Sequence, residues 1–240
     1  AGTVANPITL GGGTLSGGGQ NHTYSGVVNV SGNSFINLAD SNGPNTNTAR
    51  NITLSGLVSG SGNLTIDGNN GVSSGNQLNG TLTMNNAGNT WSGDLFFNRG
   101  TMTITSAASP GFTTNDVTFN SFGRFNLQGV NSQTLTNSGT LTYAAGAIGE
   151  LGVDNSSGTV SAPFTVNYAG PVVLGSGAAM RLFLNDGPNS VVNFTNSVTL
   201  GGNASISVGG TTAGGVATIS GVIGDGGGEF GLAINDDLGG

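Results

Sequence analysis

The 240-residue chain contains no cysteine and no lysine, and charged residues make up only 6% of it. The lack of cysteine excludes a disulfide framework and thiolate metal sites. The four arginines lie far apart, at positions 50, 99, 124 and 181. They form no basic stripe to neutralise phosphates, so we expect no nucleic-acid partner. No apolar run approaches the roughly 18 residues of a transmembrane helix, so we expect no membrane-spanning segment.

Good helix formers are scarce, and glycine accounts for 46 residues. Collagen is excluded because glycine does not recur at every third position and only six prolines are present. Gly, Asn, Ser and Thr weaken helix interiors, and no segment shows a clean helical stripe of apolar residues. The composition therefore favours a turn-rich β protein.

Short segments in which apolar and polar residues alternate are frequent. With period two, one face of each segment packs inward and the other faces water. Turn dipeptides such as Asn79-Gly80 and Asp225-Gly226 lie between them. The spacing of about ten residues is typical of a β-sandwich or a β-solenoid. The predicted strands cover residues 52–54, 64–66, 81–84, 101–104, 125–127, 140–143, 164–168, 191–194 and 206–208.

An internal repeat favours the solenoid. Residues 13–37 align without a gap with residues 80–104, at an offset of 67, and Tyr24 is aligned with Trp91. We interpret these two aromatics as packed anchors at equivalent repeat positions; the alternative is a pair of exposed sugar-stacking platforms. Stacked units of about 20–25 residues predict about ten coils and a rod on the order of 50 Å long.

These motifs resemble the autotransporter-associated β-strand repeat of bacterial passenger domains. The strings SGLVSGSGNLTI and GTLTMNNAGNTWSGDLFFNRGTMTI carry the resemblance best. Within one solenoid spanning residues 1–240, repeat-like units cover 12–38, 55–104 and 219–240, and divergent coils cover 105–218. The resemblance implies a right-handed parallel β-helix that is secreted and displayed outside a Gram-negative cell. Members of that family include adhesins, stalks and long surface fibres.

Groups for catalysis are sparse. The single histidine, His22, is predicted to lie in a turn, and the aligned position holds Asn89. Two pairs of acids could be neighbours across coils, Asp94 with Asp116 and Glu150 with Asp154, as glycoside hydrolysis requires. Nothing in the sequence marks them out. We predict that the chain is not an enzyme, although a carbohydrate-active enzyme on a β-helix remains the second alternative.

Acidic residues cluster once, near the C-terminus. Asp225, Glu229, Asp236 and Asp237 lie in a glycine-rich segment, and carboxylate oxygens suit Ca²⁺. Their spacing matches neither the EF-hand loop nor the calcium-binding nonapeptide repeat. A solubilising acidic surface is the competing interpretation. No other cofactor is expected.

The sequence predicts a non-enzymatic, extracellular structural β-solenoid on a bacterial surface, as a subunit or section of a fibre, filament or stalk. The first alternative is an adhesin that binds surface glycans or matrix. Leu238-Gly239-Gly240 stops where the interior copy continues into a Thr-Leu strand. We therefore expect either a longer repetitive chain or copies that stack head to tail.

Overall fold

The computed structural model describes residues 1–17, 20–38, 50–68, 80–105, 113–129, 133–155, 163–184, 190–209 and 215–235. These residues form strands and turns, with no helix among them. Each strand pairing is parallel, and each joins strands from successive turns of the chain. The chain is an all-β parallel solenoid, which confirms the predicted fold class. No helix long and apolar enough to cross a membrane occurs in this part of the chain.

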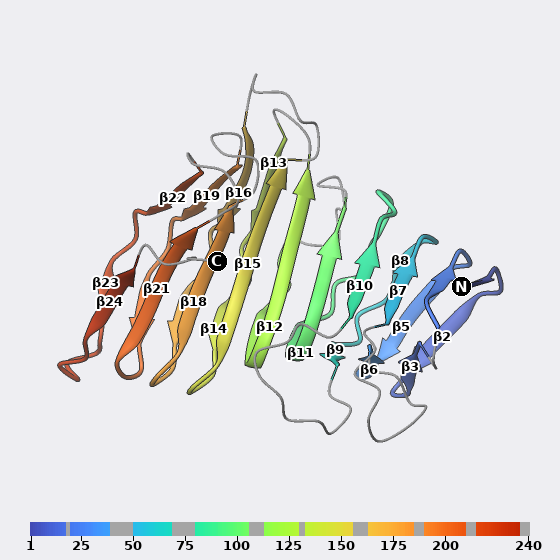
Figure 1. Ribbon diagram of the computed structural model, residues 1–240, viewed down its shortest axis with the longest axis horizontal. Coiled ribbons are helices and arrows are strands. Elements are labelled where there is room, and N and C mark those ends of the chain that lie inside the picture. The colour runs from blue at the N-terminus through green and yellow to red at the C-terminus, as the bar shows by residue number, and fades with distance from the viewer. Residues whose placement is uncertain are drawn as a thin grey trace.

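The strands stack in three columns along the long axis of the molecule, from the N-terminal strands to the C-terminal ones (Figure 1). Each coil passes through the first, second and third column in turn. The first column contains β1 (Gly2–Val4), β4 (His22–Tyr24), β7 (Asn51–Leu54), β10 (Thr81–Met84), β15 (Ile148–Asn155), β18 (Ala179–Leu184), β21 (Ala204–Gly209) and β24 (Leu232–Asn235).

The second column consists of two separate sheets. One contains β2 (Ile8–Gly11), β5 (Val28–Gly32) and β8 (Val58–Ser59); the other contains β13 (Thr134–Asn137), β16 (Phe164–Tyr168), β19 (Ser190–Phe194) and β22 (Val216–Ile219). The third column contains β3 (Thr14–Ser16), β6 (Ser34–Asn37), β9 (Leu64–Asp67), β14 (Leu141–Tyr143), β17 (Val172–Leu174), β20 (Val198–Leu200) and β23 (Ile223–Gly224).

Two long strands bend around the corner between the third and first columns. β11 (Leu95–Ile104) and β12 (Val117–Gly129) each pair with third-column strands through their first residues and with first-column strands through their last. The pairing register shifts between Phe97 and Arg99, where β11 turns the corner. The two columns are therefore continuous through these coils.

Coil length varies. Gly2 pairs with His22 in the next coil, 20 residues on, whereas Glu150 pairs with Arg181, 31 residues on. The predicted coil of 20–25 residues is therefore too short for much of the chain, because several coils are longer.

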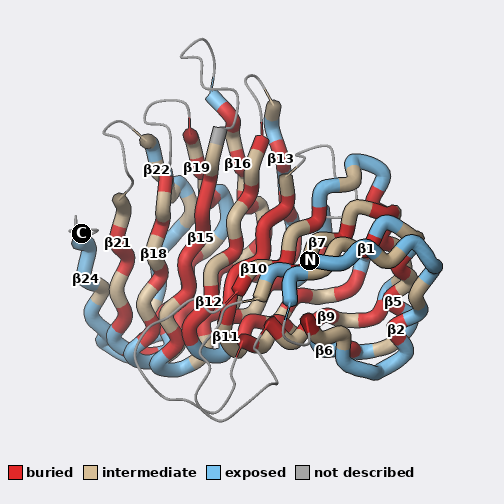
Figure 2. The backbone as a smooth tube through the Cα atoms, turned by 45° about the vertical axis from the view of Figure 1, so that its right-hand side comes forward, coloured by how far each residue is buried: buried red, intermediate tan, exposed pale blue. Residues whose placement is uncertain are grey.

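The alternating pattern of each strand places its apolar residues inside. Buried residues line the interior along the whole stack, and exposed residues gather at turns and at the two end coils (Figure 2). Aromatic rings stack in register inside the third column, where the Phe97 and Phe119 centroids lie 5.0 Å apart and those of Phe119 and Tyr143 lie 4.9 Å apart. The core is thus a set of apolar ladders that run across the coils.

Glycine at some corners is required by the close approach of successive coils. A Cβ atom on Gly56 would lie 1.9 Å from the carbonyl oxygen of Gly26, and one on Gly170 would lie 1.9 Å from that of Gly139. No side chain fits at that distance, so the glycine corners follow from the coil spacing itself.

The 67-residue repeat does not mark equivalent places in the solenoid. Thr14 belongs to β3 in the third column, whereas its aligned partner Thr81 belongs to β10 in the first column. The two copies of the repeat therefore lie in different columns, because a short apolar-polar strand can fill either column.

Candidate functional site

A row of Asn and Asp side chains crosses four coils just before the third-column strands. The backbone N–H of Asn63 donates to Oδ1 of Asn33 at 3.3 Å, and that of Asp94 donates to Oδ1 of Asn63 at 2.9 Å. The row continues from Asp116 N–H to Asp94 Oδ1 at 3.2 Å and from Thr140 N–H to Asp116 Oδ1 at 2.6 Å. Asp94 and Asp116, considered above as a catalytic pair, thus bind the backbone of the next coil.

Other amide side chains join successive coils in the same way. The N–H of Asn51 donates to Oδ1 of Asn21 at 2.9 Å, and the N–H of Thr81 donates to Oδ1 of Asn51 at 3.1 Å. On the outer face of the second column, Asn193 donates its amide N–H to Oδ1 of Asn167 at 2.9 Å. These ladders reinforce stacking along the axis, because each adds a hydrogen bond between successive coils.

The second acid pair is also held by coil-to-coil contacts. Glu150 lies between Arg124 of the preceding coil and Arg181 of the following one, with Nε of Arg124 at 2.6 Å and Nη1 of Arg181 at 3.5 Å from its carboxylate oxygens. Asp154 accepts a hydrogen bond from Nε2 of Gln128 at 2.8 Å. Glu150 is 6% exposed, so two cations neutralise a carboxylate that water barely reaches.

Tyr24 and Trp91 both point into the interior. They are 8% and 2% exposed, and Nε1 of Trp91 donates to the carbonyl oxygen of Gly62 at 2.8 Å. Burial raises the pKa of the Tyr24 hydroxyl. Tyr24 lies in β4 of the first column, whereas Trp91 lies between β10 and β11, in a segment bonded to β8 of the second column. Each is packed, but the two do not stack on each other, and neither ring is open to a sugar.

His22 lies in strand β4 rather than in the predicted turn. It is half-buried, its ring centroid lies 6.3 Å from that of Tyr24, and its Nδ1 has no hydrogen-bond partner among the described residues. Among the described residues, no carboxylate is hydrogen-bonded to Nδ1 of this imidazole, as a catalytic triad would require.

The acidic C-terminal cluster is only partly described. The carboxylate of Asp225 accepts hydrogen bonds from the N–H groups of Gly227 at 2.8 Å and Phe230 at 3.3 Å. The Gly227 N–H is the main cause of the lowered pKa of Asp225. Glu229 is exposed, and Asp236 and Asp237 lie outside the described residues. Within the described ranges no three His, Cys, Asp or Glu side chains gather closely enough to hold a metal ion. Asp225 stabilises its own turn, and the calcium site stays a prediction.

Rows of apolar side chains run through the interior to the last described coil, where their last members are exposed to solvent. Ile206, which is 2% exposed, pairs with Ile234, which is 64% exposed, in the same interior row. In the third column Val198 is buried, and its partner Ile223 is 44% exposed. A further coil at this place, from the same chain or from another copy, would cover both rows.

The amide and carboxylate ladders were missed in the sequence, although a signal for them is present. Asn or Asp stands directly before each of four successive third-column strands, as in Asn33-Ser34, Asn63-Leu64, Asp94-Leu95 and Asp116-Val117. In a chain so rich in asparagine this placement is hard to recognise until the strand columns are known.

The chain matches no protein-family model, no curated protein and no solved structure. The likeness to the autotransporter-associated repeat therefore rests on the motifs in the sequence alone.

Proposed function

We propose that this chain is a non-enzymatic structural β-solenoid, a subunit or section of a fibre, filament or stalk on a bacterial surface. The observation that carries the proposal is the side-chain ladder system, in which amides and carboxylates bind the neighbouring coil. A protein built for length gains rigidity from such contacts, because each coil is fixed to the next by both backbone and side-chain hydrogen bonds.

The acids examined as catalytic candidates support a structural role. Asp94, Asp116 and Glu150 each bond to another coil, and no open pair of carboxylates is left among them. Hydrolysis of a glycosidic bond needs one carboxyl free to donate a proton and a second free to attack or to activate water. Carboxylates that are bonded in this way stabilise the packing of the coils and are poorly placed for acid–base or nucleophilic catalysis.

The partner in this proposal is another coil of the same kind. The uncovered rows at Ile223 and Ile234 present apolar side chains beside the edge of β24 that pairs with no described strand, which suits addition of a parallel strand. Either the rest of a longer repetitive chain or a second copy stacked head to tail supplies it. Repeated head-to-tail stacking does not close, so it produces a filament.

Electron microscopy of the purified chain, combined with sedimentation velocity, tests the assembly. We expect elongated particles that lengthen with concentration, and an Ile234→Glu variant that stays short, since a charge would be buried in the joint. Thr199→Glu on the outer face of the third column is the matched control, and it should assemble as the unaltered chain does. Globular monomers at every concentration would contradict the proposal. Antibody labelling of intact cells tests the surface location, and labelling only after lysis would refute it.

A further inference from the structure

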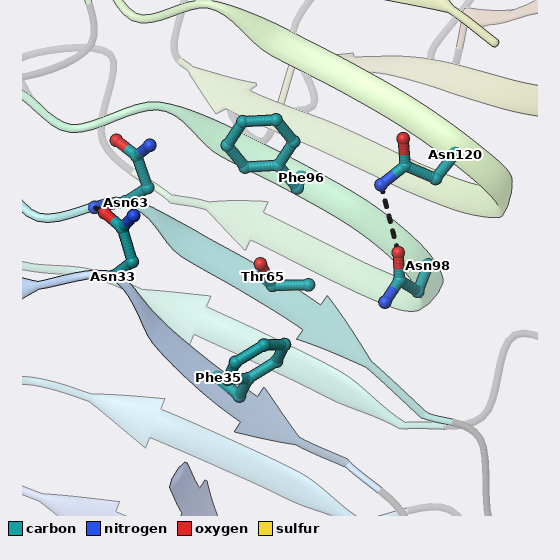
Figure 3. A pocket seen from close by; sticks show the side chains of 7 residues that line it. All are labelled: Asn33, Phe35, Asn63, Thr65, Phe96, Asn98 and Asn120. Carbon is teal, nitrogen blue, oxygen red and sulfur yellow. Dashed lines mark hydrogen bonds between the residues drawn. The ribbon is translucent and has the colours of Figure 1, made fainter. Parts of the chain in front are cut away.

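The outer face of the third column carries a shallow groove of about 340 Å³ at its N-terminal half. Phe35 and Phe96 lie on this face, with Thr65 between them (Figure 3). The strand register places the three residues in one row, because Phe35 pairs with Thr65 and Thr65 pairs with Phe96. We call this site the Phe35–Phe96 groove.

The two rings are the unusual feature of the groove. Phe35 is 45% exposed, whereas the residues that pair with Phe35 and Phe96 in this row are threonines, namely Thr14, Thr65 and Thr118. Threonine would fill an outward strand position equally well. Phe35 is exposed and Phe96 is half-buried, so each gives up part of the free energy that full burial of a ring would supply. With coils about 4.8 Å apart, positions two coils apart are about 10 Å apart, which sets the separation of the two aromatic positions.

Amide groups stand at both ends of the strands that form the groove. Asn33 and Asn63 lie at one end, and Asn98 and Asn120 lie at the other (Figure 3). The Oδ1 atoms of Asn33 and Asn63 accept backbone N–H groups, at 3.3 Å and 2.9 Å, which holds these side chains in place. Their NH₂ groups have no acceptor among the described residues, so they are oriented donors. Asn120 donates to Oδ1 of Asn98 at 3.0 Å and keeps its own oxygen as an acceptor.

Charge narrows the choice of ligand. None of the residues that line the groove is charged, and the acids nearest in the ladders are Asp67, bonded to Asn98, and Asp94, bonded to Asn63. The whole chain has a net charge of -7. Sulfated or carboxylated polymers would be repelled, so the surface suits a neutral ligand.

We propose that the Phe35–Phe96 groove binds a neutral, extended oligosaccharide that runs along the solenoid axis. Aromatic rings stack on the apolar C–H faces of pyranose rings, and amides exchange hydrogen bonds with sugar hydroxyls. The coil spacing is close to the advance per residue of an extended pyranose chain. Alternate sugars therefore lie on Phe35 and Phe96, and the sugar between them lies over Thr65. This binding is independent of the structural role and does not require that the solenoid form a fibre.

Titration calorimetry with cellohexaose, the hexamer of N-acetylglucosamine and mannohexaose tests the site on the full chain. We expect at least one of these neutral probes to bind, and glucose alone and a heparin-derived hexasaccharide not to bind. Phe35→Thr and Phe96→Thr insert the residue that already occupies the neighbouring coils. Each should weaken binding at least about tenfold, and the double variant should abolish it, with an unchanged unfolding temperature.

Val173→Thr alters the same outward row outside the groove, and it should bind as the unaltered chain does. No binding of any neutral hexasaccharide at millimolar concentration overturns the proposal. Binding retained by the double variant, or equal binding of the heparin fragment, also overturns it.

Discussion

Glu150 accepts a hydrogen bond of 2.6 Å from Nε of Arg124, a residue one full coil earlier in the solenoid. Arg181, one coil later, completes the row, and the guanidinium carbon of Arg124 also lies 4.9 Å from the ring centroid of Phe183. The row joins three coils through a buried carboxylate. Removal of this carboxylate should therefore destabilise the solenoid more than the loss of a surface ion pair would.

Glu150→Gln should lower the free energy of unfolding by about 2–3 kcal/mol, because two guanidinium groups would lose their anionic partner. Urea unfolding followed by circular dichroism measures the change. Asp154→Asn, on the same strand but half-exposed, is the control and should cost about 1 kcal/mol or less. If the two substitutions lowered the free energy of unfolding equally, the Arg124–Glu150–Arg181 row would stabilise the fold no more than a half-exposed contact does.

Gly56→Ala should destabilise the solenoid by at least about 2 kcal/mol, because the new Cβ would lie 1.9 Å from the Gly26 carbonyl oxygen. Gly13→Ala is the matched control, since no atom lies within 4 Å of the Cβ position there. Thermal unfolding of the two variants checks the difference. If both substitutions left the unfolding temperature unchanged, the coils would have to move apart at Gly56 at little cost, which the close packing there does not predict.

Tyr143→Phe should raise the free energy of unfolding by about 1 kcal/mol. The Tyr143 hydroxyl is buried without a hydrogen-bond partner among the described residues, and the ring stacks on Phe119 at 4.9 Å. Phenylalanine keeps the stacking and removes the unsatisfied group. A lower unfolding temperature for the variant would show that the hydroxyl has a partner that stabilises the fold.

Stability should fall as the pH rises above about 10, the ordinary pKa of tyrosine. Burial raises the pKa of Tyr143 and of Tyr168, so both keep their protons in the folded state while the unfolded chain loses them. The contribution is complete below pH 10 and is lost progressively above it. Urea unfolding from pH 8 to pH 11 measures the slope, and replacing both tyrosines by phenylalanine should flatten it. An equally steep slope in the double variant would assign the loss to other groups.

If Asp225, Glu229, Asp236 and Asp237 form the predicted calcium site, calcium should raise the unfolding temperature. Melting curves in millimolar calcium and in a chelator are the measurement. A ligand bound only to the folded state raises this temperature, whereas equal unfolding temperatures in the two solutions would favour a solubilising acidic surface.

The sequence alone was sufficient for the fold class, and each of the nine predicted segments overlaps a strand, although the other strands were not predicted. The segments at 64–66, 81–84 and 164–168 alternate so regularly that they can only be strands with one buried face, and they correspond to β9, β10 and β16. Local pattern and local backbone preference carry this information, which is why it could be recovered without knowledge of any contact.

Only the tertiary structure decided which strand lies in which column and which side chains meet. Leu95-Phe96-Phe97 is apolar throughout, so alternation does not reveal that Phe96 faces outward and Phe97 inward. The pairing of Glu150 with Arg181 likewise depends on a coil of 31 residues, longer than the internal repeat suggests. The length of each coil depends on how far its corners extend. Contacts between coils depend on the sum of these lengths, and no local sequence pattern contains that sum.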